Sequence, residues 1–456
     1  MWWQCLLLLF TLNAGTTALE IRGTLNALNN DDNSIDQPYY IIGAQGSTLY
    51  PVQIKQESFA KQLLGKLCTF SVNNHQLTKV VDCNKRRMLS SFVSSKSGIG
   101  LTSYPYPSIR GLVMIANQIC EYKATISKTD VLRVFNPIIN EYFRNCSFGS
   151  LGVDLQIVDG IVLPCNGMGV WNYTFDSHKC GAYEIYTWMS LAQNQAQSRS
   201  INVLSYPHQI LVIPELSQCP WAGLGSVSCA SQCNVWIKSG SMGSIVALAH
   251  ELGHNLGLNH ASSPTDSYGD YSCVMGGCCP TRCFNVFQQA RMNWNKPLTT
   301  LYVANNSYSD WITYDIPSAI TKTVNYIQIV LNYTHVFTIS YRTRLGYDNG
   351  LSETYSGALS FHIFSSDSQE VAATRAFVIG TLSNPGGIWN HRDSGVQVRL
   401  NNKDIQKASV SIKLVSSATF CGNGVCDNNE TYLSCPQDCK KNNDNNNVIC
   451  FCSTTS

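Results

Sequence analysis

An eleven-residue stretch, 250–260, constrains this chain more than any other feature. It reads HELGHNLGLNH and holds three of the nine histidines. His250 and His254 are four residues apart, so on a helix their imidazoles project from one face, one turn apart. Gly257 gives the chain the freedom to turn sharply and to bring His260 beside the other two. Three imidazoles that leave one position open make the ligand set of a catalytic Zn²⁺ site rather than of a structural one.

Glu251 follows the first histidine, where its carboxylate can reach a water molecule at the metal and act as a general base. The preceding residues, GSMGSIVALA, predict a buried helix over 244–258 with Ser241 or Ser244 as its N-cap. The alternative is an ordinary helix whose histidines hydrogen-bond within the core. All five fixed positions of HExxHxxGxxH are filled, which favours the metal site. The other six histidines are scattered, and we expect them to have structural or surface roles.

The twenty cysteines indicate an oxidising compartment. Residues 1–18, MWWQCLLLLFTLNAGTTA, are typical of a signal peptide, with Thr16 and Ala18 suited to its cleavage site. A buried N-terminal helix is the alternative. Several N-x-[ST] triplets fit a glycoprotein, and they begin at Asn145, Asn172, Asn305, Asn332 and Asn429. We therefore expect a secreted, extracellular and disulfide-bonded protein.

Composition and charge exclude several other classes of protein. The net charge is +2 and no basic block is longer than three residues, so a nucleic-acid-binding surface is not expected. Hydrophobic residues make up 44% of the chain, which excludes a disordered chain. After the signal peptide no apolar segment approaches the roughly 20 residues of a membrane helix. The C-terminus has no hydrophobic tail for a lipid anchor, so we expect no membrane anchor.

Cysteines gather on both sides of the histidine motif. Four follow it, at Cys273, Cys278, Cys279 and Cys283, and three precede its helix, at Cys219, Cys229 and Cys233. Such close spacing fits either disulfides or a second zinc site, and the secreted context favours disulfides. Nineteen cysteines remain after removal of the signal peptide, so at least one thiol is unpaired or bonded to another molecule.

Changes in the hydrophobic pattern along the chain predict an α+β protein built from several regions. Residues 109–298 mix strands with helices at 130–142, where Pro137 introduces a kink, and at 183–197. Residues 299–418 consist of short β-rich runs typical of a β-sandwich. A β-rich N-terminal region precedes both, and a cysteine-rich module with an Asn-rich tail ends the chain. The predicted parts are 1–18, 19–108, 109–298, 299–418 and 419–456.

Further blocks of sequence resemble one known family. Met275 stands fifteen residues after His260 in YGDYSCVMG, and FNVFQQARMNW follows. Together with HELGHNLGLNHA and the segment 339–364, these blocks resemble the gametolysin family of metzincin metallopeptidases, which are secreted zinc endopeptidases. The resemblance implies a metzincin-like zinc protease domain with Glu251 as general base and Met275 packed beneath the metal. The zinc ligands that it implies are His250, His254 and His260.

Two departures from related patterns matter. Astacin-like metzincins have a tyrosine two residues after the methionine, but Gly277 stands there in this chain. Tyr268 and Tyr271 are nearby on the other side of the methionine, and neither is assigned as a further ligand. Residues 19–108 also lack the usual propeptide motif with a PRCG-type cysteine.

The N-terminal region nevertheless has features of a propeptide. The basic triplet at 85–87 precedes a Ser/Gly-rich stretch and suits a processing site, with a solvated turn as the alternative. Cys68 and Cys83 are the two cysteines of this region, and we expect them to pair. The alternative is that a free Cys83 thiolate binds the zinc and blocks it.

These features predict a secreted zinc-dependent endopeptidase that cleaves extracellular or cell-wall glycoproteins. An extended substrate would pair with an edge strand that we place at 221–227. The alternative is an inactive metzincin-fold glycoprotein with an adhesion or matrix-binding role, which the intact Glu251 and histidines disfavour. One Zn²⁺ is expected. Ca²⁺ is a further candidate, bound between acidic residues of the C-terminal module: Asp427, Glu430 and Asp438.

Overall fold

A computed structural model describes most of the chain. The described residues are the strands within 19–83, then 107–227, 232–278, 280–303, 310–331, 335–365, 376–391, 394–414 and Cys439. Several predicted features lie outside them: the signal peptide, the triplet at 85–87, the acidic residues of the C-terminal module, and the N-x-[ST] triplets at Asn305, Asn332 and Asn429.

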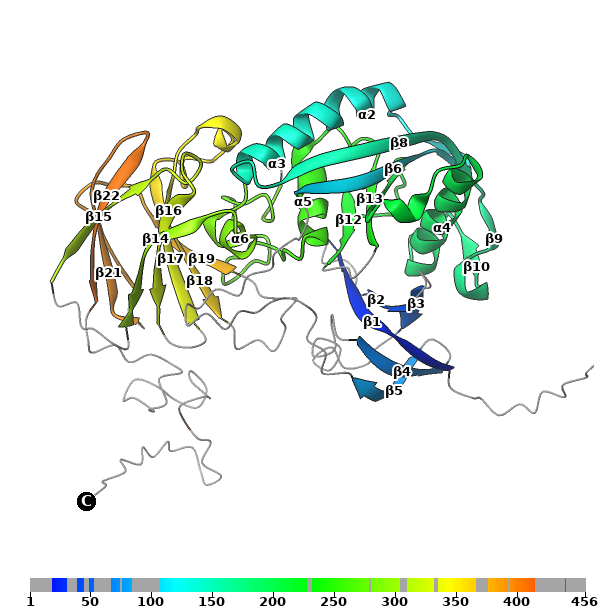
Figure 1. Ribbon diagram of the computed structural model, residues 1–456, viewed down its shortest axis with the longest axis horizontal. Helices are drawn as coiled ribbons and strands as arrows, with labels where there is room; N and C mark the ends of the chain where they lie inside the picture. The colour runs from blue at the N-terminus through cyan, green and yellow to red at the C-terminus, as the bar shows by residue number, and fades with distance from the viewer. Residues whose placement is uncertain are drawn as a thin grey trace, which may run out of the picture.

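The centre of the molecule is a mixed β-sheet with helices on both faces (Figure 1). Strand β6 (Ser108–Ile119) pairs in parallel with β8 (Gly152–Leu163) and with β11 (His208–Ile213). Strand β13 (Cys233–Lys238) continues the sheet parallel to β11. Strand β12 (Gly223–Ser226) then pairs antiparallel with β13 and lies beside the helix that carries the histidine motif.

Helices cover both faces because the central strands are apolar on both sides. Strand β6 places Val113 and Ile115 in one hydrophobic core, and Leu112 and Met114 in the other. The first core is covered by helices α2, α3 and α5, and the second by α4. The bounds of these helices are Lys128–Val134 (α2), Asn140–Cys146 (α3), Ala182–Ser198 (α4) and Ile245–Asn255 (α5).

The helix predicted at 130–142 is present but interrupted. A π-helical turn, η1 (Phe135–Ile139), separates α2 from α3 and contains Pro137. Proline has no backbone N–H and clashes with the preceding turn, so regular α-helical hydrogen bonding cannot continue through it. The predicted helix is therefore interrupted at Pro137 by a widened turn between two short helices.

The N-terminal strands join the same sheet, which has eleven strands among the described residues. Strand β1 pairs with β4 and β2 along its length, and its last residues pair with β12. Cys68 is disulfide-bonded and lies opposite Cys83 in the β4–β5 pair, as the predicted pairing requires. The bounds are Leu19–Asn30 (β1), Tyr39–Ala44 (β2), Leu49–Val52 (β3), Leu67–Asn73 (β4) and Gln76–Cys83 (β5).

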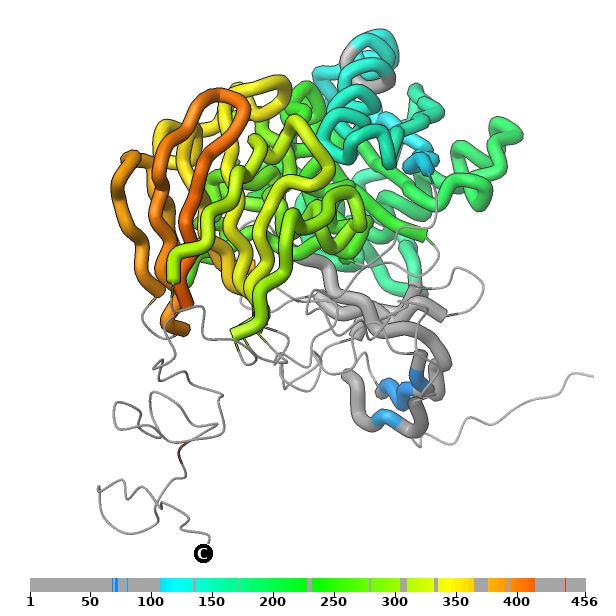
Figure 2. The backbone as a smooth tube through the Cα atoms, turned by 60° about the vertical axis from the view of Figure 1, so that its left-hand side comes forward, coloured from blue at the N-terminus to red at the C-terminus, as the bar shows by residue number. Residues whose placement is uncertain are grey.

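Beyond residue 295 the short β-rich runs form two sheets that share one core. The five-stranded sheet has the order β14-β16-β17-β18-β19, and the four-stranded sheet has the order β15-β22-β21-β20. Six of these strands have the bounds Lys296–Tyr302 (β14), Ile312–Pro317 (β15), Val324–Val330 (β16), Ile388–His391 (β20), Val396–Lys403 (β21) and Lys407–Leu414 (β22). Ile339 and Phe361 of the first sheet meet Val398 and Val410 of the second. Figure 2 shows these strands, in yellow to orange, against the green segment that contains α5 and α6 (Val286–Arg291). The strands used below are β17 (His335–Arg342), β18 (Ala358–Ser365) and β19 (Ala376–Leu382).

Disulfides account for the clustered cysteines that the structure describes, with the exception of Cys273. The bonds are Cys120–Cys165, Cys146–Cys283 and Cys180–Cys219, and Cys233 and Cys278 are also disulfide-bonded. The prediction of disulfides rather than a second zinc site is therefore confirmed for these cysteines, whereas Cys229 and Cys279 lie outside the described residues. Cys273 is a buried free thiol, which agrees with the expectation that at least one cysteine is unpaired or bonded to another molecule.

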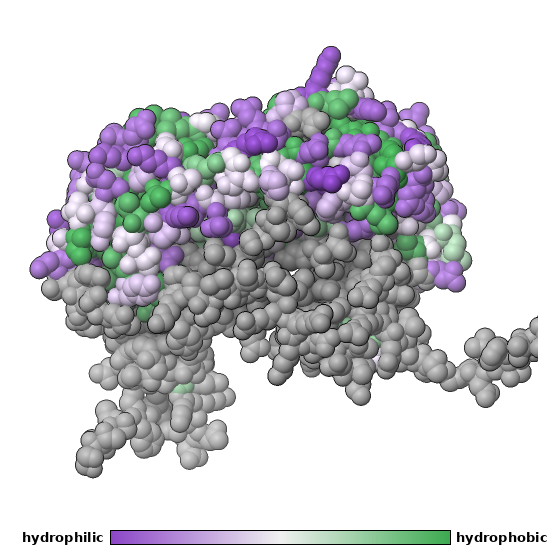
Figure 3. All heavy atoms as spheres, viewed as in Figure 1, coloured by the Kyte–Doolittle hydropathy of each residue, from purple (hydrophilic) through white to green (hydrophobic). Residues whose placement is uncertain are grey.

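Within the described ranges, no helix has both the length and the apolar character needed to cross a bilayer. On the face shown in Figure 3, hydrophobic side chains lie in small groups among hydrophilic ones. Asn145 and Asn172, which begin two of the N-x-[ST] triplets, are exposed, as an acceptor site requires.

Candidate metal centre

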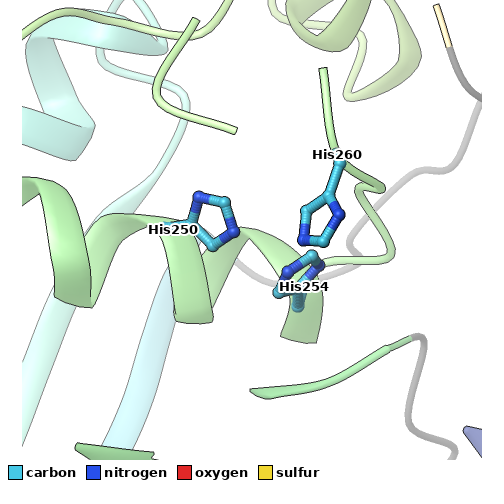
Figure 4. A group of neighbouring side chains, drawn as sticks. All are labelled: His250, His254 and His260. Carbon is cyan, nitrogen blue, oxygen red and sulfur yellow. The ribbon is translucent and has the colours of Figure 1, made fainter. Parts of the chain in front are cut away.

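The three histidines of the motif meet at one point, although they come from a helix and from the loop that follows it (Figure 4). One nitrogen of each imidazole lies within 4.8 Å of the other two. All three residues are buried, with exposed fractions of 6% for His250, 0% for His254 and 2% for His260. The structure therefore brings together the complete set of histidines that the sequence predicts.

The helix that carries the first two histidines begins and ends where its local sequence requires. Ser244 is the N-cap of α5, since its hydroxyl accepts a hydrogen bond from the Ala247 N–H at 3.3 Å. The sequence predicted that the helix ends at residue 258, but it ends earlier, at Asn255. The reason is the turn at Gly257, where φ is +86° and a residue with a side chain is disfavoured. This turn returns the chain toward α5 and places His260 beside it.

The hydrogen bonds of the imidazoles indicate which nitrogens face a metal. Nδ1 of His250 lies 2.9 Å from the Val274 carbonyl oxygen, and Nδ1 of His254 lies 2.9 Å from the Leu258 carbonyl oxygen. A carbonyl oxygen only accepts, so each Nδ1 carries the proton and donates it. The lone pair of each ring is then on Nε2, which is how metal-binding histidines are oriented. The donor set therefore fits a zinc ion.

Met275 lies directly against the helix between the two histidine turns. A Cβ atom added at Gly253 would be 2.4 Å from the Met275 sulfur, so α5 has room for this thioether only because residue 253 is glycine. The Met275 carbonyl also accepts a hydrogen bond of 2.8 Å from the N–H of Ala261, the residue after His260. The methionine thus supports both the helix and the loop of the candidate centre.

Glu251 is buried between α5 and strand β12, with 1% of its surface exposed. A Cβ atom at Gly223 would be 2.6 Å from one carboxylate oxygen, and a Cβ atom at Gly225 would be 2.9 Å from the other. The two glycines of β12 therefore leave the space that this carboxylate occupies. The predicted segment 221–227 does contain a strand beside Glu251, and the carboxylate fits there because the two residues of β12 that face it are glycines.

The outer edge of β12 is not open, however. Residues 28–30 of β1 pair with it in antiparallel register: Leu28 opposite Ser226, Asn29 opposite Gly225, and Asn30 opposite Leu224. We expected this edge to be available to an extended substrate. Instead the N-terminal strand of the same chain occupies it, an arrangement that no local pattern of the sequence indicates.

Tyr268 is a close neighbour of the histidines that the sequence did not assign to the site. Its ring centroid lies 4.0 Å from that of His260 and 6.2 Å from that of His250. Tyr271 is half exposed at 50%. The position of Tyr268 depends on how the loop after His260 folds back. The spacing of Tyr268 from the histidine motif in the sequence does not indicate that the two are in contact.

Two other groups near cysteines are not candidate metal sites. Cys120, Glu121 and Cys165 lie close together, but the two cysteines are bonded to each other and cannot be thiolate ligands. Burial raises the pKa of the free Cys273 thiol to about 12, and nearby Asp270 adds to the rise. Cys273 is therefore protonated at neutral pH and is a poor metal ligand.

Comparison with known proteins agrees with this site. A family model described as gametolysin peptidase M11 matches residues 110–380, which include the three histidines, Glu251 and Met275. A protein named autolysin from Chlamydomonas reinhardtii is 26% identical, over 34% of this chain and 30% of that protein. The match thus spans less than a third of the relative's length.

Proposed function

The chain belongs to the gametolysin peptidase M11 family, and we propose that it is a zinc endopeptidase of the metzincin class whose ligands are His250, His254 and His260. The observation that supports this most is that one nitrogen from each of the three imidazoles of the HExxHxxGxxH motif lies within 4.8 Å of the other two. M11 peptidases are metallopeptidases, and buried neutral imidazoles are ligands that zinc prefers.

We propose that Glu251 is the general base. A zinc ion held by the three histidines would polarise the scissile carbonyl and lower the pKa of the attacking water. The Glu251 carboxylate then takes the proton from that water and passes it to the leaving amine nitrogen. Its burial between α5 and the two glycines of β12 keeps it close to the histidines in one orientation. The substrate backbone would lie extended along β12.

We propose extracellular or cell-wall glycoproteins as substrates. The relative named autolysin and the disulfides support action outside the cell. We propose in addition that residues 1–18 are a signal peptide and that exposed asparagines are N-glycosylated. We also propose that 109–298 is the catalytic domain, 299–418 a β-sandwich, and 419–456 a cysteine-rich module. An inactive adhesion or matrix-binding role is disfavoured, because Glu251 and all three histidines are retained.

Cleavage of casein or gelatin by the purified protein tests this function. We expect cleavage that a zinc chelator abolishes and that added Zn²⁺ restores, because the three histidines can release and rebind the ion. Elemental analysis should find one zinc per chain in the active preparation. Activity that is unchanged by the chelator would contradict the proposal. A folded preparation that holds one zinc but cleaves no protein would contradict it as well.

We further propose that residues 19–108 are a propeptide that inhibits by covering the substrate edge. The support is the pairing of residues 28–30 with β12, next to the glycines that face Glu251. A peptide in the same antiparallel register would compete with β1 for the same backbone groups. Inhibition of this kind needs no free thiol, which agrees with the disulfide at Cys68.

Replacing Asn29 by proline in the full-length protein should raise its basal activity. Proline lacks the N–H and restricts the backbone at the position opposite Gly225, so the β1–β12 pairing should weaken. Loss of one or two backbone hydrogen bonds, each about 1 kcal/mol, corresponds to roughly a tenfold rise. Peptide cleavage is measured while N-terminal sequencing verifies that the N-terminal region is still attached.

Asn26→Pro is the matched control, because Asn26 lies opposite Ile41 of β2 and not opposite β12. We expect a smaller rise in activity from this variant. An equal rise from both would mean that loosening the N-terminal strands, rather than freeing the edge of β12, activates the enzyme.

Sequencing of the mature active protein should find a start near Met88. A fully active form that begins near Leu19 would contradict removal of the N-terminal region.

A further inference from the structure

The loop that follows the third histidine is attached to the C-terminal strands. This segment, residues 261–285, is the Met275 loop. Ser262 forms a bridge with the edge strand β19: its N–H donates to the Ala376 carbonyl at 3.2 Å, and its carbonyl accepts from the Val378 N–H at 2.8 Å. The loop therefore extends the five-stranded sheet two residues after His260.

A buried carboxylate forms the second attachment. Asp270 is fully buried, and its oxygens accept hydrogen bonds from Nε2 of His362 at 3.0 Å and from Nδ2 of Asn285 at 2.8 Å. The Ser272 hydroxyl donates to it at 2.6 Å. Burial alone would raise the pKa of Asp270, but the His362 ring and these hydrogen bonds hold it below its usual value. His362 lies on β18 and is 2% exposed.

Arg342 of β17 makes a third attachment. Its buried guanidinium pairs with the Asp348 carboxylate, with Nε 2.8 Å from Oδ2, and also donates to the Ser272 and Cys283 carbonyls. Asp348 in turn accepts a hydrogen bond of 2.9 Å from the Cys283 N–H. Two neighbouring strands of the C-terminal sheet thus hold the Met275 loop through charged, desolvated hydrogen bonds, which are stronger than neutral ones.

The same loop orients two of the three histidines. Its Val274 carbonyl accepts the hydrogen bond from Nδ1 of His250. Ala261, which follows His260, donates to the Met275 carbonyl at 2.8 Å and accepts from the Asp270 N–H at 3.1 Å. A shift of Asp270 would therefore move both the partner of His250 and the residue next to His260. Changes to such hydrogen-bond partners of ligands typically cost 10–100-fold in metal affinity or activity.

We propose that His362 is a positioning residue of the metal centre: from β18 it fixes Asp270 and, through the Met275 loop, the orientation of His250 and His260. Strands β17, β18 and β19 then help to hold the metal centre in place and are more than a separate C-terminal module. This inference rests on the proposed zinc site. It adds a residue 102 positions beyond His260 in the sequence, outside every motif of the ligand set.

Replacing His362 by phenylalanine tests the proposal, because the ring is kept while the hydrogen bond to Asp270 is lost. We expect the zinc dissociation constant, measured by competition with a chromogenic chelator well below the melting temperature, to rise about 10–100-fold. In zinc-saturated protein kcat should fall while KM changes little, because no substrate contact is removed. His362→Gln should restore both values to near wild type, since its amide nitrogen can donate from a similar position.

Ser360→Ala is the matched control, because Ser360 is buried two residues earlier on the same strand. It should leave zinc affinity unchanged. A folded His362→Phe protein with wild-type zinc affinity and kcat would overturn the proposal, as would failure of His362→Gln to differ from His362→Phe. If His362→Phe does not fold, Asp270→Asn decides by the same measurement. Absence of zinc from the wild-type protein would contradict the proposed function instead, so the two failures are distinguishable.

Discussion

Replacing Glu251 by glutamine is expected to abolish peptide cleavage while one zinc remains bound. Glutamine has the same shape as glutamate and fits the space that Gly223 and Gly225 leave beside α5. It cannot take a proton from water at neutral pH, and the three histidines are untouched. General-base catalysis contributes roughly 10²–10⁴ in rate, and here the same group also returns the proton to the leaving amine. The measurements are kcat/KM on a peptide substrate and the zinc content by elemental analysis.

Glu184→Gln is the control for a buried glutamate changed in the same way. Glu184 lies in the first turn of α4, where its carboxylate accepts a hydrogen bond of 3.0 Å from the Gly181 N–H, and an amide oxygen can accept that bond as well. We expect near-normal activity from this variant. A Glu251→Gln protein with full zinc content and near-normal kcat/KM would exclude Glu251 as the base. The proton would then have to be taken by another group, with Tyr268 the first to examine because its ring lies against His260.

Much of the candidate site could be predicted from the sequence because its constraints are local. The spacing of His250 and His254 follows from the helical repeat, and Ser244 and Gly257 mark where that helix begins and where the chain must turn. Each of these signals lies within a few residues of the side chain that it positions. Near the motif, the observed elements overlap their predicted ranges for the same reason, because local residues determine where they begin and end.

The supports of the site could not be predicted, because each joins segments that are distant in the sequence. Asp270 and His362 are 92 residues apart and belong to no periodic pattern, so His362 could only be given a general structural role. Asn29 and Gly225, which pair between β1 and β12, are 196 residues apart (225 − 29). Contacts of this kind are set by how the sheets pack, and a strand's edge looks the same in sequence whether it is covered or open.

Replacing His254 by alanine is expected to remove zinc from the site and cleavage with it. His254 is fully buried at the end of α5, and Nδ1 is fixed by the Leu258 carbonyl so that Nε2 faces the other two rings. Two histidines hold a zinc ion far less tightly than three, and the loss should exceed the roughly 10–100-fold that follows from changing an outer hydrogen-bond partner. Dialysis against a weak chelator followed by elemental analysis should find less than one zinc per chain.

His208→Ala separates this effect from a general loss of packing. His208 is also fully buried, and its Nδ1 lies 3.1 Å from the side-chain oxygen of Asn255 at the end of the same helix. It lies outside the set of three close imidazole nitrogens. Its removal should lower the melting temperature but leave one zinc bound. Full zinc content in His254→Ala would place the metal elsewhere, and zinc loss in both variants would mean that α5, not its ligand atom, had been disturbed. Only the contrast between the two histidines assigns the ion to the motif.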